Sequence, residues 1–356
     1  MKKALIYDPY LDTMGGGERY ILTFAVGLVK NGYAVDLAWN NPDAILEAEK
    51  RFNLDLSGIK INQQSYEDLS LSSGLIKRFN CTKNYDLTFW VSDGSIPFLF
   101  SKNNFIHFQV PFTHIGGNQL LNLAKISRTN KFIFNSAFTS AVVKKQLPLS
   151  SSVIIYPPID IASFTPGKKE NLILSVARFD SPSHAKRQDV LIDAFAQLYK
   201  QDKSYRLVLA GGLKGGEDFL ESLRAKAGKL PVEIVPNPKF TDLQKLYSSA
   251  KIFWHAAGYE IDEVIDPEKV EHFGITTVEA MSAGAIPIVI NRGGQREIIT
   301  GETGYLVDSI LEMVSDTLSL INSPEKMKFM AQKAIVRSKE FSVDNFYQKI
   351  TDILPV

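Results

Sequence analysis

Two spacings of hydrophobic residues alternate along the chain, and they predict alternating strands and helices. Short continuous apolar runs are typical of strands buried inside a parallel sheet, whereas apolar residues spaced three or four apart form one face of a helix. The runs that predict strands are 4–7, 34–39, 59–62, 86–91, 105–108, 131–135, 153–160, 172–177, 206–210, 232–235, 251–255 and 286–290. Helical spacing predicts helices at 18–30, 43–50, 137–145, 188–199, 219–227, 242–250, 274–284, 310–321, 323–338 and 341–353. Because the two types alternate, we expect parallel sheets covered by helices.

The length of the chain and the prolines near its middle predict two domains. The 356 residues exceed what a single hydrophobic core usually organises. Pro157 and Pro158 end a predicted strand, and a charged turn precedes the next one. We therefore expect an N-terminal domain at residues 1–165, a C-terminal domain at 166–338 and a final helical segment at 339–356.

Composition narrows the class of protein without naming a function. Hydrophobic residues make up 45% of the chain and charged residues 22%, as in ordinary soluble globular proteins. The net charge of +1 gives no field for a nucleic-acid duplex, so we expect no nucleic-acid partner. The one cysteine, Cys81, excludes an intramolecular disulfide and fits a reducing compartment. No apolar run reaches the ~18 residues of a membrane span, and the run after Lys3 ends at Asp8, too early for a signal peptide. We expect a cytoplasmic protein, and peripheral association with a membrane stays open.

The most informative stretch is EHFGITTVEAMSAG at residues 271–284. If Gly274 to Thr277 opens the helix, free backbone N–H groups there attract an anion such as a phosphate. Glu279 then lies in the first turns, and Glu271 lies outside on the preceding loop. Eight positions along a helix span roughly 12 Å, too far for the two carboxylates to share one bond in acid/base chemistry. The spacing suits two carboxylates that bind hydroxyls at opposite ends of one ligand, and a nucleotide-sugar has that layout.

This stretch resembles the E-x7-E motif of retaining glycosyltransferases with the GT-B fold, in particular family 4. The resemblance spans nearly the whole chain and is weakest from about residue 40 to residue 100. It implies two Rossmann-like α/β domains that face each other across a cleft, with the segment 339–356 crossing back to the first domain. It also implies that Glu271 meets the donor sugar and Glu279 the ribose. The residues that it places at the sugar and phosphates are Phe273, Gly274, Ile275, Thr276 and Thr277.

Two glycine turns match the family as well. Gly16 and Gly17 follow the first predicted strand, and Gly212 follows the strand at 206–210. Glycine lets a backbone approach a ligand closely, but from the residues alone a plain tight turn is the favoured explanation of Gly16 and Gly17. No G-x-G-x-x-G dinucleotide fingerprint is present. The resemblance implies that Gly16 and Gly17 face the donor phosphates and that Gly212 lies near the nucleotide.

Two cations flank the loop after the strand at 172–177. Arg178 and Lys186 lie between that strand and a helix N-terminus, where a diphosphate would be stabilised as leaving group. An ordinary solvated loop is the alternative from spacing alone. The family places an Arg and a Lys here on the phosphates. The longer loop of this chain, which ends in His-x-Lys-Arg-Gln, resembles the dolichol-oligosaccharide mannosyltransferases and favours a mannose donor with guanine slightly over a uracil nucleotide.

Three further features leave alternatives open. His107 ends an apolar strand, where a lone histidine is more often a core residue, but the resemblance implies a bond to a sugar hydroxyl, with His114 as the rival. Residues 66–80 form either an amphipathic surface helix that contacts a membrane or a lipid acceptor, or a helix packed on its own core. The acidic insertion 258–270 either shapes a ligand pocket or is a surface loop.

We therefore expect a retaining hexosyltransferase of polysaccharide biosynthesis that moves mannose or a similar sugar from a GDP- or UDP-sugar to a glycan or lipid-linked acceptor. No Asp-x-Asp motif for a divalent cation stands out, so we expect neither a metal nor a cofactor. The alternatives are a nucleotide-sugar epimerase, which would convert the donor without an acceptor, and a non-catalytic nucleotide-sugar-binding protein. A third alternative is a sugar phosphorylase with pyridoxal phosphate, which would show the absorbance band of its bound cofactor.

Overall fold

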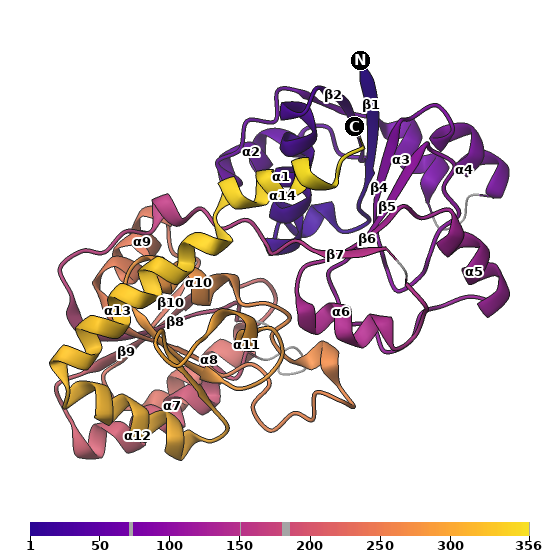
Figure 1. Ribbon diagram of the computed structural model, residues 1–356. Coiled ribbons are helices and arrows are strands. Elements are labelled where there is room, and N and C mark those ends of the chain that lie inside the picture. The colour runs from indigo at the N-terminus through magenta and orange to yellow at the C-terminus, as the bar shows by residue number, and fades with distance from the viewer. Residues whose placement is uncertain (71–73, 150, 180–185, 356) are drawn as a thin grey trace. The chain divides into compact units, whose positions relative to one another are not determined.

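The computed structural model describes residues 1–70, 74–149, 151–179 and 186–355. It divides into two compact units, each built on one parallel sheet (Figure 1). The first unit contains residues 1–158 and 344–356, and the second contains residues 159–343. The parallel α/β architecture predicted from the hydrophobic pattern is confirmed in both units.

The first sheet has seven parallel strands in the order β3-β2-β1-β4-β5-β6-β7. Its strands are β1 (Lys2–Tyr7), β2 (Tyr33–Ala38), β3 (Ile59–Ile61), β4 (Leu87–Val91), β5 (Asn103–Phe108), β6 (Lys131–Phe134) and β7 (Ser152–Ile154). Its helices are α1 (Gly16–Lys30), α2 (Ala44–Phe52), α3 (Gln63–Leu69), α4 (Leu75–Thr82), α5 (Gln119–Ser127), α6 (Ala137–Lys144) and α14 (Val343–Ile353). All five residues of β4 are buried, as expected for a strand covered on both faces.

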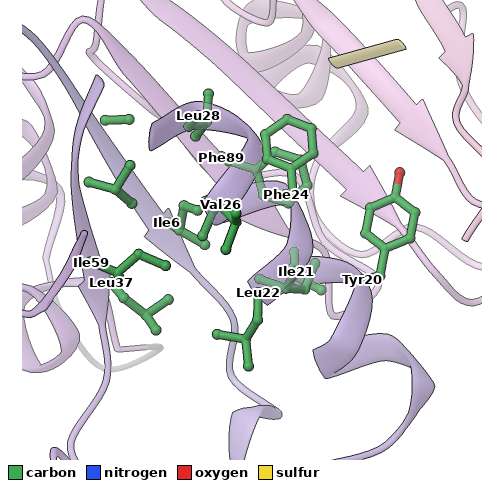
Figure 2. Packing of buried hydrophobic residues seen from close by; sticks show 14 of the residues in the cluster. Ile6, Tyr20, Ile21, Leu22, Phe24, Val26, Leu28, Leu37, Ile59 and Phe89 are labelled. Atoms are coloured by element: carbon green, nitrogen blue, oxygen red, sulfur yellow. The ribbon is translucent and has the colours of Figure 1, made fainter. Parts of the chain in front are cut away.

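Helix α1 supplies much of the core of the first unit (Figure 2). Ile21, Leu22 and Leu28, on the apolar face of this helix, are fully buried. Phe24 from the same helix packs on Phe89 of β4, with the ring centroids 4.1 Å apart. These contacts join the first helix to the centre of the sheet.

The C-terminal helix α14 belongs to the first unit, although most of the second unit precedes it in the chain. Phe346 and Ile350 are buried in the same hydrophobic cluster as α1. The ring of Phe346 meets the ring of Tyr20 edge to face at 4.8 Å. The last residues of the chain therefore complete a core that the first residues begin.

The chain divides between the two units after Pro158, earlier than the boundary at residue 165 expected from the sequence. Ile159 already pairs with Ser342, which is part of the second unit. Phe164 is buried there and meets the ring of Tyr247 at 4.9 Å. Residues 159–165 therefore join the second unit because their apolar side chains enter its core.

The second sheet has six parallel strands in the order β10-β9-β8-β11-β12-β13. Its strands are β8 (Glu170–Val176), β9 (Arg206–Gly211), β10 (Val232–Pro236), β11 (Ala250–His255), β12 (Ile286–Ile290) and β13 (Tyr305–Val307). Its helices are α7 (Gln188–Gln201), α8 (Glu217–Ala227), α9 (Phe240–Ser249), α10 (Ile275–Ser282), α11 (Gln295–Ile298), α12 (Ile310–Ile321) and α13 (Pro324–Ser338).

The structure differs from the sequence analysis at three places. The single helix expected at 66–80 is two helices, α3 and α4, and residues 71–73 between them lie outside the described residues. Helix α5 was not expected, although Asn118 caps it by accepting a hydrogen bond from the backbone of Leu120. Strand β7 ends at Ile154, well before the predicted end at residue 160. Within the part of the chain that the structure describes, none of the helices is long and apolar enough to cross a bilayer.

Candidate functional site

Helix α10 begins where the sequence predicts, immediately after Gly274. Gly274 has φ +119°, a left-handed conformation that residues with a side chain rarely adopt. A Cβ atom at this position would also lie only 2.9 Å from the amide nitrogen of Gln295. Glycine is therefore required here for two independent reasons, and it sets the direction in which α10 starts.

Two donors hold the carboxylate of Glu271, on the loop before α10. Lys186 Nζ lies 2.9 Å from Glu271 Oε2, and His255 Nε2 lies 3.2 Å from the same oxygen. Burial raises the pKa of Glu271, but Lys186 and His255 together outweigh burial and hold that pKa well below its usual range. Glu271 is thus a fixed anion that can only accept hydrogen bonds.

The sequence did not single out His255, the last residue of β11. Its side chain is only 2% exposed. The backbone N–H of Ala257 points at His255 Nδ1 over 3.4 Å. When Nδ1 accepts this bond, the proton of the neutral ring sits on Nε2, which then donates to Glu271. The signal that could have found it is its place at the carboxyl end of a parallel strand, where ligand sites gather.

A turn after β12 supports the backbone of Glu271. The N–H of Gly294 donates to the carbonyl oxygen of Glu271 at 2.8 Å. The N–H of Gly293 donates in turn to Glu263 Oε2 at 2.7 Å, and the same carboxylate pairs with Arg296. Glu263 lies in the acidic insertion 258–270, whose role the sequence left open. Part of that insertion therefore folds onto the turn that supports Glu271.

The N-terminal end of α10 contains buried polar atoms without partners. Among the described residues, neither the Thr277 hydroxyl nor either amide atom of Gln295 makes a hydrogen bond, although both side chains are fully buried. A helix N-terminus also carries partial positive charge. Unpaired polar groups beside it are typical of a site that an anionic ligand completes. Ile275 and Thr276 are half-buried at this end, whereas Phe273 is buried and packs on Phe341.

Glu279 lies on the inward side of α10 and is 8% exposed. The hydroxyl of Tyr247 donates to Glu279 Oε2 at 2.8 Å. Burial, together with this carboxylate, raises the pKa of Tyr247 well above its ordinary value, so the phenol keeps its proton. The orientation of Glu279 is therefore set by a fully buried donor.

Arg178 and Gly212 meet at the carboxyl ends of β8 and β9. Phe179, the residue after Arg178, donates its N–H to the Gly212 carbonyl at 2.8 Å. Gln188, at the start of α7, donates to the Arg178 carbonyl at 3.0 Å. The Arg178 side chain is exposed. Residues 180–185 of the predicted phosphate loop lie outside the described residues.

The second unit thus brings most of the predicted site residues to one edge of its sheet. Arg178, Lys186, Gly212 and Glu271 each follow a parallel strand, and carboxyl ends of parallel strands share an edge. The contact between Lys186 and Glu271 was not predicted, because the sequence assigned Lys186 to the phosphates alone.

The predicted residues Gly16, Gly17 and His107 lie in the first unit. Gly16 starts α1, and a Cβ atom on Gly17 would lie 2.1 Å from Gln109 Oε1, so this turn also serves packing. His107 is fully buried, stacked on Tyr20 with ring centroids 4.3 Å apart. Burial lowers the pKa of His107 to about 3, and the nearby backbone of Ile133 only partly opposes this shift. His107 is therefore a neutral ring inside the core, whereas its rival His114 is exposed.

Asp8 is a further buried group that sequence reasoning missed. It follows β1, is 1% exposed, and one of its oxygens has no partner among the described residues. Its other oxygen accepts a bond from the N–H of Tyr10 at 2.9 Å. Burial raises the pKa of Asp8 to about 7, and Glu18 nearby adds to this shift.

Comparison with known proteins gives a consistent picture. A family model described as glycosyl transferases group 1 matches residues 158–337. Among curated proteins, the GDP-Man:Man(3)GlcNAc(2)-PP-Dol alpha-1,2-mannosyltransferase of Dictyostelium discoideum is 30% identical over 212 residues, which cover 54% of this chain and 40% of that protein. The chain thus spans about 40% of the length of this relative.

Solved structures resemble nearly the whole chain. A glycosyltransferase from Rickettsia africae has a TM-score of 0.76 at 18% identity and covers 99% of this chain and 97% of its own. Anabaena HepE, solved with UDP and glucose, has a TM-score of 0.70 at 18% identity and covers 99% of this chain and 98% of its own. At this identity the likeness shows the fold, two parallel-sheet α/β units of the GT-B type.

Proposed function

Because the chain belongs to the group 1 glycosyltransferase family, we propose that it transfers a hexose, such as mannose, from a nucleoside-diphosphate sugar to a glycan or a lipid-linked acceptor. The observation that carries the proposal is the ionised carboxylate of Glu271, held by Lys186 and His255 directly before the N-terminus of α10. A fixed acceptor beside an anion-attracting helix end fits a ligand that joins sugar hydroxyls to a diphosphate.

Each predicted residue has a role in this proposal. Glu271 accepts hydrogen bonds from the donor sugar, and Glu279 accepts them from the ribose. Lys186 donates one of its three N–H bonds to Glu271 and directs the others to the diphosphate, which Arg178 also binds. The remaining donor contacts are assigned to Gly16, Gly17, Gly212, Phe273, Gly274, Ile275, Thr276 and Thr277.

His107 is assigned to the sugar by family resemblance alone. Its ring is fully buried beside Tyr20, so direct contact with a sugar hydroxyl requires that it become uncovered. In the present structure it supports the core at the end of β5. The role stays a prediction.

We propose that the reaction retains the anomeric configuration. The bond between the anomeric carbon and the leaving phosphate breaks, and the bond to the acceptor oxygen forms on the same face. The acceptor proton passes to the leaving phosphate oxygen. Arg178, Lys186 and the start of α10 stabilise the negative charge that grows on the diphosphate. This scheme asks no side chain to act as nucleophile, and metal independence remains part of the proposal.

The base and the acceptor are proposed from the relatives. The name of the Dictyostelium protein specifies GDP-mannose and a dolichol-linked glycan, whereas HepE was solved with UDP and glucose. We propose a GDP-sugar before a UDP-sugar, a role in polysaccharide biosynthesis, and work on the cytoplasmic side with peripheral contact to a membrane.

Thermal unfolding of the purified protein with GDP, UDP, ADP and their sugar conjugates tests the proposal. A ligand at ~100 times its dissociation constant stabilises the folded state by about 2.7 kcal/mol, which raises the melting temperature measurably. A shift with GDP and GDP-mannose is the expected result. No shift with any nucleotide, for a folded sample, would contradict the proposal. Conversion of the donor to an epimer in the absence of an acceptor would show instead that the protein is a nucleotide-sugar epimerase.

A further inference from the structure

Two helices of the first unit turn their apolar side chains to the solvent. Ile76 of α4 is 78% exposed and Leu120 of α5 is 77% exposed. The only buried residue of α4 is Thr82, and α5 buries Asn122 and Ile126. The exposed apolar residues of the two helices are Leu75, Ile76, Phe79, Leu120, Leu121 and Leu123. This pattern reverses that of an ordinary surface helix, whose apolar face packs inward.

The aromatic residues between these helices join them into one surface. The ring of Phe79 in α4 meets Phe100 edge to face at 5.1 Å. The guanidinium of Arg128, directly after α5, lies 5.4 Å from the centroid of the Phe100 ring. Lys125 of α5 lies 5.8 Å from the centroid of Phe98. We call these two helices and the segment 98–100 the α4–α5 surface; both helices lie on the right in Figure 1.

The charge of this part of the chain is strongly one-sided. Residues 94–159 contain no Asp or Glu, although the whole chain has a net charge of only +1. The basic residues in that stretch are Lys102, Lys125, Arg128, Lys131, Lys144 and Lys145. Helix α4 adds Lys77 and Arg78, and Lys83 follows it, again without a carboxylate. The nearest carboxylates in sequence are Glu67 and Asp68 on α3, Asp86, which pairs with Lys102, and Asp93 and Asp160, which border the stretch 94–159.

We propose that the α4–α5 surface docks on an anionic lipid bilayer. The exposed apolar residues enter the boundary between headgroups and acyl chains, while Lys77, Lys83 and Lys125 meet lipid phosphates. Charge complementarity selects this occupant, because a second copy of the chain would bring the same cations to the contact. The inference deepens the proposed function and rests on it for its purpose, since a lipid-linked acceptor is presented at such an interface.

Sedimentation of the purified protein with vesicles tests this proposal. We expect binding to phosphatidylcholine vesicles that contain phosphatidylglycerol, and binding about tenfold weaker to phosphatidylcholine alone or at high salt. Replacing both Ile76→Asn and Leu120→Asn should weaken binding about tenfold or more. The matched control replaces Leu311→Asn and Val336→Asn, which are similarly exposed in the second unit, and should bind like the native protein.

A second pair of variants separates charge from apolar contact. Lys77→Glu with Lys83→Glu should abolish the preference for anionic vesicles, whereas Lys326→Glu with Lys328→Glu on α13 should preserve it. The proposal would be overturned if the native protein did not bind anionic vesicles, or if the Ile76→Asn, Leu120→Asn variant bound them like the native protein. A native dimer that the Ile76 and Leu120 variant converts to monomer without affecting vesicle binding would also overturn it. The assay contains no donor, so its failure is distinct from failure of the transferase proposal.

Discussion

Glu271 is half-buried and ionised, and its low pKa depends on its two donors, Lys186 and His255. Glu271→Gln removes the negative charge but keeps a side chain of the same shape. We expect the transfer rate to fall by about 10²–10³-fold, because the amide is a weaker acceptor for the donor sugar. The fold should persist, since the residue lies on the loop before α10. Glu268→Gln, an exposed change three residues earlier, should transfer at the native rate. Native activity of the Glu271 variant would show that the site is misassigned.

His255 is the donor that the sequence did not reveal, and its effect should be exerted through Glu271. His255→Ala removes one hydrogen bond to a half-buried carboxylate, a loss of about 1.5–3 kcal/mol and thus about 10- to 100-fold in kcat/KM. A Gln side chain can donate to Glu271 and accept from Ala257 as His255 does. We therefore expect His255→Gln to restore part of the rate. Equal activity of the Ala, Gln and native proteins would exclude this positioning role.

Asp8 predicts a dependence of stability on pH. Its pKa of about 7 in the folded protein lies above its ordinary value of 3.8. The folded state therefore binds a proton more tightly than the unfolded state does. The resulting stabilisation is complete below about pH 4 and is lost as the pH rises towards 7, by up to about 1 kcal/mol per pH unit.

Asp8→Asn isolates this contribution, because the amide cannot ionise. Relative to the native protein, the unfolding free energy of the variant should increase from pH 5 to pH 8. Urea denaturation of both proteins at each pH measures this difference. The comparison is needed because His107 acts in the opposite direction. Its depressed pKa of about 3 stabilises the fold above about pH 6.5 and less at lower pH. A constant difference across this range would contradict the account of Asp8.

The start of α10 is a feature of the whole element, since one residue sets the path of the helix. Gly274→Ala introduces a side chain at φ +119° and against Gln295. We expect a loss of about 1–3 kcal/mol in unfolding free energy and weaker nucleotide binding. Gly301→Ala is the control, because no atom lies within 4 Å of the new methyl group and its backbone is not left-handed. It should change stability by less than about 0.5 kcal/mol. Chemical denaturation and nucleotide-dependent melting measure both effects.

At the level of the whole molecule, the chain ends in the unit in which it begins. Phe346→Ala on α14 removes a buried ring from the core that α1 forms, and we expect a cost of about 3–5 kcal/mol. Phe329→Ala on α13 removes a half-exposed ring and should cost much less. Urea denaturation measures this cost. Hydrogen exchange should show that backbone amides of the first unit lose protection. If the second unit lost protection instead, α14 would not be part of the first core.

Local patterns were sufficient to predict much of the fold and the frame of the site. Alternating apolar runs and helical spacing predicted both parallel sheets. A strand buried on both faces leaves a continuous apolar run in the sequence, whereas a helix buried on one face leaves apolar residues spaced three or four apart. Gly274 and the helix after it were predicted because turn chemistry is local. The comparisons confirm the family resemblance and the fold, while the roles of Glu271, Arg178, Lys186 and Glu279 stay predictions.

Only the tertiary structure decided which groups meet. Glu271, Lys186 and His255 are far apart in sequence and come together because parallel strands share a carboxyl edge. The burial of His107, the return of α14 and the outward faces of α4 and α5 depend on which surface covers each element. The spacing of apolar residues along the chain shows that a helix or strand has an apolar face, whereas long-range packing determines what that face contacts.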